Sequence, residues 1–141
     1  MEELLLVKGV TPELYRKVEP YLTVYGSGQL NLNTASPVAL RALGLSKAGV
    51  DGLISYRSGE DDVERTPDDR RLSSIDSVET ELEKYVPAED RTRLIALTKS
   101  LAVGSSAFRT TIRASSGEPA RSVSANCVID RRGLVKLWEE R

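Results

Sequence analysis

The sequence has 141 residues, of which 40% are hydrophobic and 29% are charged, a composition typical of a folded protein with one ordinary core or two small lobes. The 20 basic and 21 acidic side chains give a net charge of −1, which disfavours a function that depends on neutralising phosphate. Because it has no histidine and only one cysteine, Cys127, the chain alone cannot build a Ser-His-Asp or Cys-His site, or a zinc site of histidines or several cysteines.

Short helices and glycine turns are predicted for the start of the chain. Residues 1–8 predict a short helix that ends at Gly9, and Thr11 is placed to cap a second helix that begins at Pro12. Residues 21–25 (YLTVY) are rich in β-forming side chains and predict a strand that ends in glycine turns.

A helical hairpin is predicted next. Residues 29–40 (QLNLNTASPVAL) indicate a short strand, a bend, and a helix that Ser36 caps. After the turn at 44–46 (GLS), residues 47–57 predict a second helix with one face at the 0, 3, 4, 7 spacing, formed by Val50, Leu53, Ile54 and Arg57. The same order of helix, glycine, apolar residue and hydroxyl occurs around residues 9–11, so we expect two small helical units side by side.

Residues 59–71 (GEDDVERTPDDRR) form a loop by composition, because six of them are acidic and only Val63 is apolar. The loop carries the candidate chemical groups Glu60, Asp61, Asp62, Asp68 and Asp69. Paired carboxylates act as acid and base only in a buried cleft, so a hydrolase is the weaker interpretation. Calcium is the cofactor that such a set of oxygens would bind, although the spacing is not that of an EF-hand. A solvated acidic surface is the simplest interpretation.

Helical spacing returns after this loop. One helix is predicted from Ile75 to Tyr85, with Ser73 and Asp76 as a capping box. Another follows Pro87 and extends through the leucines at 94, 97 and 101.

From about residue 106 the hydrophobic period changes to two. Residues 108–115 and 122–129 alternate apolar and polar side chains, and residues 134–138 (LVKLW) predict a third strand. The sequence therefore predicts an antiparallel meander with one face buried, in which Cys127 is a small core residue. Three strands alone are marginally stable, so other segments must cover that face.

The single Phe and the single Trp of the chain fall in these strands. Phe108 and Trp138 could be contacts for a partner protein, since aromatic side chains often anchor interfaces. Core packing is the plainer interpretation of both residues.

The hairpin could hold either DNA or protein. DNA-binding hairpins use a Gly-apolar-Gly turn whose backbone N–H groups point at phosphate. Here Ser46 and Thr11 occupy the second glycine position of the two turns, and their hydroxyls are placed to accept hydrogen bonds from those N–H groups. We therefore expect no nucleic-acid partner and interpret the hairpin as a rigid unit that presents a surface to another protein. A helix-hairpin-helix DNA-binding module is the alternative.

Two stretches resemble a known family. Residues 3–45, from ELLLVKGVTPELY through LNLNTA to LGL, and ISYR at 54–57 resemble the helical insert of the general secretion pathway protein K family, the large minor pseudopilin of bacterial type II secretion. Residues 99–114 (KSLAVGSSAFRTTIRA) and VKLW at 135–138 resemble the return of that chain into its pilin-like sheet.

The resemblance implies a role in protein export. Family members are periplasmic, anchored to the inner membrane, and cap the tip of the pseudopilus with the smaller minor pseudopilins I and J. They help to start its assembly and are not enzymes, and pseudopilins of this system are often associated with calcium. Members begin with a prepilin leader, a long hydrophobic helix and the first strands of the sheet; none of these is in this sequence, so we expect it to be a fragment.

Together these features predict an α+β fold with two domains. Residues 1–103 are expected to form a helical insert domain of hairpin-containing, SAM-like units, and residues 104–141 the C-terminal strands of a pilin-like domain. An unpaired strand edge is a template for association, so we expect the edge next to the absent strands to be exposed, or covered by a second copy in a homodimer.

Overall fold

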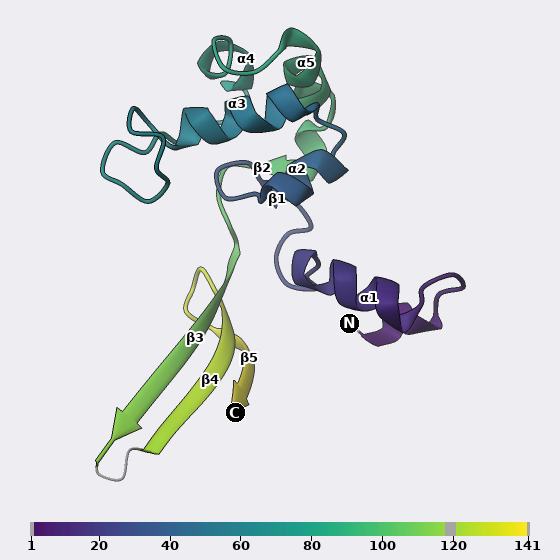
Figure 1. Cartoon of the computed structure of the whole chain (residues 1–141), viewed down its shortest axis with the longest axis vertical. Helices are drawn as coiled ribbons and strands as arrows, with labels where there is room; N and C mark the ends of the chain where they lie inside the picture. The colour runs from purple at the N-terminus through teal and green to yellow at the C-terminus, as the bar shows by residue number, and fades with distance from the viewer. Residues whose placement is uncertain (1, 118–120, 141) are drawn as a thin grey trace. The chain divides into compact units, whose positions relative to one another are not determined.

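The computed structural model describes residues 2–117 and 121–140 (Figure 1). The fold is α+β, with short helices in the first part of the chain and a three-stranded antiparallel sheet at its C-terminal end. The chain divides into two compact units. Unit 1 contains residues 1–22 and 29–104, and unit 2 contains residues 23–28 and 105–141. The segment 23–28, which the predicted domain 1–103 included, therefore groups with the sheet.

The first helices of unit 1 are short. A 3₁₀-helix, Glu2–Leu6, precedes α1, Pro12–Val18, which continues as a 3₁₀-turn, Glu19–Tyr21. The Thr11 cap is confirmed, because its Oγ1 accepts a hydrogen bond from the Leu14 N–H at 3.1 Å. The strand predicted over 21–25 is wrong: no strand forms there, because strand propensity is expressed only where a neighbouring strand is available.

Two helices form in the segment where the hairpin was predicted. They are α2, Pro37–Ala42, and α3, Lys47–Arg57, and they pack together. Ser36 caps α2 by accepting a hydrogen bond from the Ala39 N–H at 3.2 Å. The short strand predicted before it is β1, Leu30–Asn31, which pairs in parallel with β2, Leu101–Ala102.

Two predictions for the following helices are corrected. The helix expected from Ile75 to Tyr85 is reduced to α4, Val78–Glu81, and the capping box is absent because the Ser73 hydroxyl donates to Glu81 Oε1 at 2.8 Å. After α5, Ala88–Ala96, and a 3₁₀-turn, Thr98–Ser100, Leu101 lies in β2 and not in a helix.

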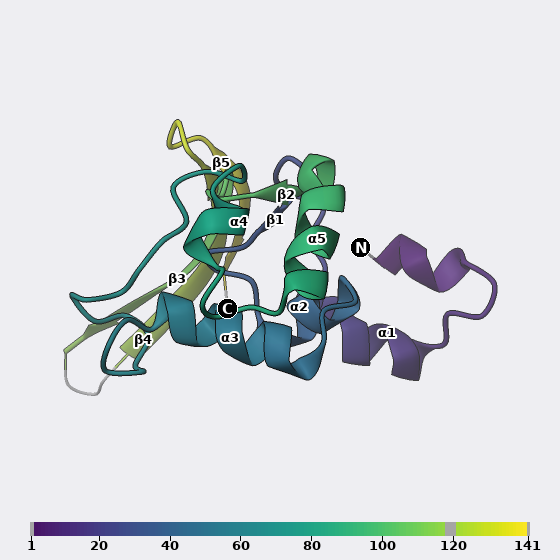
Figure 2. The same cartoon turned by 90° about the horizontal axis from the view of Figure 1, so that it is seen from above.

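The core of unit 1 lies between residues 32 and 101. Its members are buried apolar side chains from β1 to β2, chiefly Leu32, Leu40, Leu45, Leu53, Leu82, Leu94 and Leu101. The two glycines inside α3 allow α5, and the segment that joins α4 to α5, to approach α3 closely (Figures 1 and 2). A Cβ at Gly49 would overlap the Asp90 carboxylate, and a Cβ at Gly52 would overlap the backbone carbonyl of Tyr85.

The sheet of unit 2 is the predicted meander. It has the order β3-β4-β5, formed by β3, Ala107–Ser116, β4, Arg121–Asp130, and β5, Val135–Glu140. The register pairs Phe108 with Ile129 and Thr110 with Cys127, and Cys127 in turn with Trp138. Residues that are paired directly share a face, so Phe108 and Thr110 of β3, Cys127 and Ile129 of β4, and Trp138 of β5 lie on the same side.

The burial predicted for that apolar face is wrong. Cys127 is buried at the centre of the sheet, but nine of the ten residues of β3 are exposed. The alternation therefore specifies a face that the described residues leave largely uncovered. In the part of the chain that the structure describes, no helix is long and apolar enough to cross a membrane.

Candidate functional site

The turn between α2 and α3 is held by side chains of the chain itself. The Ser46 hydroxyl caps α3 by accepting a hydrogen bond from the Gly49 N–H at 3.0 Å. The Asp90 carboxylate, in the first turn of α5, accepts hydrogen bonds from the Ser46 N–H at 2.9 Å and from the Ser46 hydroxyl at 2.6 Å. Asp90 is buried, so these charge-assisted bonds fix the turn against α5.

This geometry differs from that of a phosphate-binding turn. A phosphate needs free N–H groups and a positive local field. At this turn the N–H groups of Ser46 and Gly49 already have acceptors, and the Asp90 carboxylate adds a negative charge beside them. At the turn before α1, Thr11 accepts a hydrogen bond from the Leu14 N–H in the same way. Both hydroxyls therefore cap the helix that follows them.

The motif LNLNTA contributes a cross-link inside unit 1. The Asn33 amide group donates to the backbone carbonyls of Leu72 at 3.0 Å and of Val103 at 2.9 Å. Its oxygen accepts from the Leu72 N–H at 2.8 Å, while the Asn33 N–H donates to the Asn31 side chain at 3.0 Å. One side chain thus ties together the end of the acidic loop and the segment after β2.

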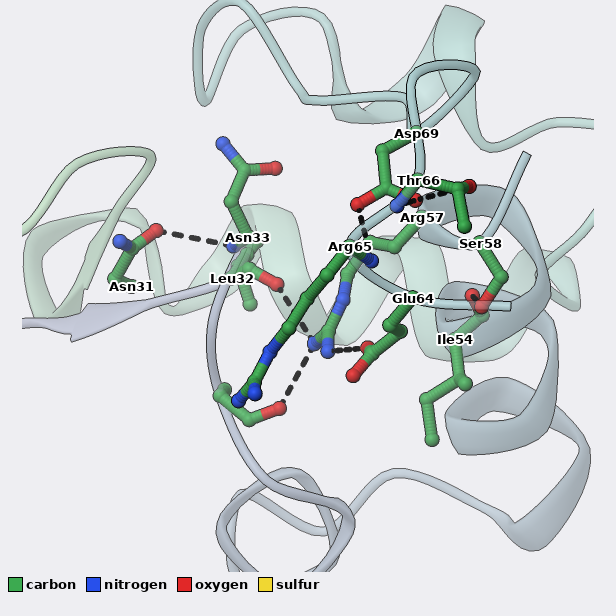
Figure 3. Close-up of polar contacts among 11 residues, drawn as sticks. Asn31, Leu32, Asn33, Ile54, Arg57, Ser58, Glu64, Arg65, Thr66 and Asp69 are labelled. Atoms are coloured by element: carbon green, nitrogen blue, oxygen red, sulfur yellow. Dashed lines mark hydrogen bonds and ion pairs between the residues drawn. The ribbon is translucent and has the colours of Figure 1, made fainter. Parts of the chain in front are cut away.

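Arg57 is a second buried polar anchor (Figure 3). Its guanidinium donates to the carbonyl of Ala35 at 2.8 Å, approaches the carbonyl of Leu32 at 3.4 Å, and forms an ion pair with Glu64. Arg57 therefore satisfies backbone groups around the bend that precedes α2. The position was predicted as part of an apolar face, and its side chain does face the core, but its role there is to pair buried carbonyls.

Most carboxylates of the acidic loop close the loop on itself. Asp68 accepts hydrogen bonds from the Thr66 hydroxyl at 2.7 Å and from the N–H groups of Glu60 at 2.7 Å and Asp61 at 3.3 Å. The Thr66 hydroxyl and then these N–H groups hold the pKa of Asp68 below its usual value. Asp69 accepts from the Thr66 N–H at 3.3 Å.

The other three acids have separate partners. The Asp61 carboxylate accepts a hydrogen bond from the Val63 N–H at 2.8 Å. Glu60 lies 3.6 Å from the Arg70 guanidinium, and Asp62 accepts a hydrogen bond from the Ser55 hydroxyl at 3.2 Å. Over residues 2–117 and 121–140, no three Asp, Glu or Cys side chains are grouped so that they could hold a metal ion. The five predicted candidates share one loop, but they do not converge on one point.

A phenol and a carboxylate pair at the edge of the core of unit 1. Tyr56 donates to Glu81 and packs edge-on against Tyr85, with ring centroids 5.4 Å apart. Burial and this hydrogen bond raise the pKa of Tyr56. The hydroxyls of Ser77, Tyr56 and Ser73 hold the pKa of Glu81 below its usual value. At neutral pH the pair is therefore a neutral phenol and an ionised carboxylate.

The apolar face of the sheet in unit 2 presents the two predicted aromatic residues. Phe108 is 46% exposed and Trp138 is 51% exposed, on either side of the buried Cys127. Ile112 and Val123 extend the same face and are about half exposed. The face is thus formed by large apolar side chains from all three strands, an arrangement typical of interaction surfaces.

The strand edges of this sheet are also open. β3 and β5 are the outer strands of the sheet. Among the described residues, no further strand pairs with the outer side of either one. The N–H and C=O groups along ten residues of β3 therefore alternate between β4 and the open side.

Comparison with family models, with curated proteins and with solved structures gives no match to this chain. The contacts described above therefore carry the functional argument. Sequence reasoning missed Asp90 as a determinant of the hairpin turn, since its partner lies 44 residues away and no local pattern marks it.

Proposed function

We propose that this chain is part of a large minor pseudopilin of the general secretion pathway protein K family. In this proposal it acts at the tip of the type II secretion pseudopilus, through contacts with the smaller minor pseudopilins I and J, in pseudopilus assembly and protein export. The role is structural and not enzymatic. In this proposal the location is the periplasm, with the full-length protein anchored to the inner membrane.

One observation carries the proposal of a protein-interaction role: the uncovered apolar face of the sheet. Burying a large apolar side chain contributes about 1.5–3 kcal/mol. Phe108, Ile112 and Trp138 each leave about half of their surface in water, so the sheet gains stability when another surface covers them. A pilin-like sheet that receives further segments fits this need.

The hairpin supports a packing role in preference to a DNA-binding role. Hairpin-containing, SAM-like units often serve as compact building blocks, and here the turn at Ser46 is closed by Asp90. A nucleic-acid backbone would meet a carboxylate at the point where it needs donors. We therefore place protein contact ahead of the DNA-binding alternative.

Two further elements belong to the proposal. One of the two outer edges of the sheet pairs with a further strand or with a second copy of the chain in a homodimer. Calcium, if it binds, does so at the acidic loop, where it would have to replace the hydrogen bonds that Asp68 now accepts.

The test is a calorimetric titration of this chain with the soluble regions of minor pseudopilins I and J from a type II secretion system. We expect specific binding that Trp138→Ser weakens by about tenfold, because a half-exposed aromatic anchor is worth roughly 1.4 kcal/mol or more. Ile95→Ser is the matched control, since Ile95 is a similarly exposed apolar residue of α5 in unit 1.

Each other outcome has a defined meaning. Salt-dependent binding to a DNA duplex, with none to the pseudopilins, would replace the proposal with the DNA-binding alternative. Loss of pseudopilin binding when calcium is chelated would add a metal site at the acidic loop. Equal weakening by Trp138→Ser and Ile95→Ser would show that the sheet face is not the contact.

A further inference from the structure

A cavity of about 500 Å³ lies within unit 2, at the end of the sheet where β4 turns into β5. Residues 24–27 form one wall, and the first residues of β3 and the turn after β4 form the others. Three cationic side chains line it, Arg131, Arg132 and Lys136, against a single carboxylate, that of Asp130. The cavity is therefore basic in a chain whose net charge is −1.

The carboxylate of the cavity is already engaged by its own turn. Asp130 accepts hydrogen bonds from the N–H groups of Arg132 at 2.9 Å and Leu134 at 3.0 Å. It also forms ion pairs with Lys136 at 3.4 Å and with Arg132 at 3.8 Å. The Leu134 N–H is the main cause that lowers the pKa of Asp130, so this group stays ionised and paired at neutral pH. One carboxylate against three cations leaves two positive charges of the cavity uncompensated.

Hydrogen bonds hold the Arg131 side chain in place, but no carboxylate among the described residues pairs with its charge. Its Nε donates to the Ser105 carbonyl at 2.6 Å, and its backbone N–H donates to the Ser106 carbonyl at 3.3 Å. Within the described residues, no ion pair or hydrogen bond engages its two terminal nitrogens. A guanidinium that is fixed through Nε presents the remaining N–H groups in the planar arrangement that matches a carboxylate.

The basic character continues along the polar face of β3. Ala107 lines the cavity, and the alternation of the strand places Arg109 and Arg113 on the same side as Ala107. Neither arginine has an ion pair in the part of the chain that the structure describes. An extended segment with a carboxylate at every second residue would match this row of charges.

We propose that this cavity and the adjoining polar face of β3 bind an acidic, extended segment of a partner protein, with one carboxylate against the Arg131 guanidinium. A peptide fits better than a nucleic acid for two reasons. The open edge of β3 offers backbone N–H and C=O groups to an extended peptide, and the net negative charge of the chain disfavours a polyphosphate. The inference does not depend on the proposed role at the pseudopilus tip.

The experiment is a calorimetric titration of the whole chain with a synthetic octapeptide in which Glu and Thr alternate. The isosteric Gln-Thr octapeptide is the neutral control. We expect the acidic peptide to bind with an affinity that falls as salt is added, and Arg131→Gln to weaken binding about tenfold, the loss expected for one charge-assisted contact.

Two further variants separate the cavity from general charge. Arg132→Gln tests the same cavity with a side chain that is 80% exposed and so tolerates substitution. Arg16→Gln is the matched control, because Arg16 is an exposed arginine of α1 in unit 1. We expect Arg132→Gln to weaken binding and Arg16→Gln to leave it unchanged, and both variants to keep the thermal unfolding midpoint of the unsubstituted chain.

The remaining outcomes overturn the inference. Equal binding of the Glu-Thr and Gln-Thr peptides would mean that charge plays no part. Equal effects of Arg131→Gln and Arg16→Gln would place any contact elsewhere. Binding of inorganic phosphate or a DNA duplex more tightly than the acidic peptide would identify the ligand class as phosphate, and no binding of any probe would show that the cavity has no anionic ligand.

Discussion

Asp90 accepts hydrogen bonds from both the backbone N–H and the hydroxyl of Ser46, and so joins the first turn of α5 to the turn that precedes α3. Asp90→Ala removes both acceptors and leaves the two donors of Ser46 without their partner. We expect a loss of about 1–3 kcal/mol in the free energy of unfolding, measured by urea denaturation. Asp51→Ala is the control: its carboxylate is exposed and, among the described residues, pairs only with Lys47, so we expect a change below about 0.5 kcal/mol.

Arg57→Ala tests the anchor below the hairpin. The substitution leaves the Ala35 carbonyl unpaired and removes the ion pair with Glu64, so we expect a loss of about 2–4 kcal/mol in the free energy of unfolding. Arg71→Ala should change it by less than about 0.5 kcal/mol, because Arg71 is exposed. Similar effects of the two substitutions would contradict the role of Arg57.

Gly52→Ala tests the close approach of α3 to Tyr85. Alanine normally stabilises a helix relative to glycine by up to about 1 kcal/mol. Here the new Cβ would overlap a backbone carbonyl that cannot turn aside, so we expect a loss of about 1–3 kcal/mol instead. Thermal unfolding measures the sign directly. A stabilised Gly52→Ala variant would show that the segment around Tyr85 packs differently.

The pKa of Glu81 is lowered in the folded state by the hydroxyls of Ser77, Tyr56 and Ser73. A lowered carboxyl pKa adds stability that is complete above the unfolded pKa and is lost as pH falls through the folded value. The expected window therefore begins near the ordinary value of 4.5 and extends to lower pH. Glu81→Gln should flatten the fall of the unfolding free energy between about pH 5 and pH 3. An unchanged slope would contradict the contribution of Glu81.

The reactivity of the Cys127 thiol measures how well side chains cover the face of the sheet. Cys127 lies between the exposed Phe108 and Trp138 and is itself 3% exposed. A thiol reagent such as Ellman's reagent should react with the folded chain slowly and with the urea-unfolded chain rapidly. The Phe108→Ala variant should increase the rate in the folded chain by uncovering the strand. A rate that Phe108→Ala leaves unchanged would show that opening of the sheet, and not side-chain cover, controls access.

The sequence predicts those parts of the fold that depend on local rules. The caps Thr11, Ser36 and Ser46 are read from a hydroxyl before a helix, and all three accept the expected hydrogen bonds. The alternation in residues 108–115 and 122–129 predicts the paired strands β3 and β4. These signals depend on residues that are close in the chain, so they can be interpreted without knowing which distant segments will come together.

The errors fall where distant segments decide the outcome. Leu101 follows a helical spacing, yet it becomes a strand because it pairs with Leu30, 71 residues earlier. Ser73 could cap a helix, yet its hydroxyl bonds to Glu81. Arg131 was not predicted as a site residue, because the cavity around it needs residues 24–27 as a wall and these lie about a hundred residues earlier in the chain. A single sequence does not show which distant segments of the chain will contact one another.

The parallel pair of β1 and β2 has a consequence for protein engineering. Leu30 pairs directly with Leu101, so the start and the end of segment 29–104 pass within about 5 Å of each other at these two residues, the spacing of neighbouring strands. Among the described residues, the core cluster draws none from outside that segment. We therefore expect segment 29–104 to fold when it is inserted into a surface loop of another protein.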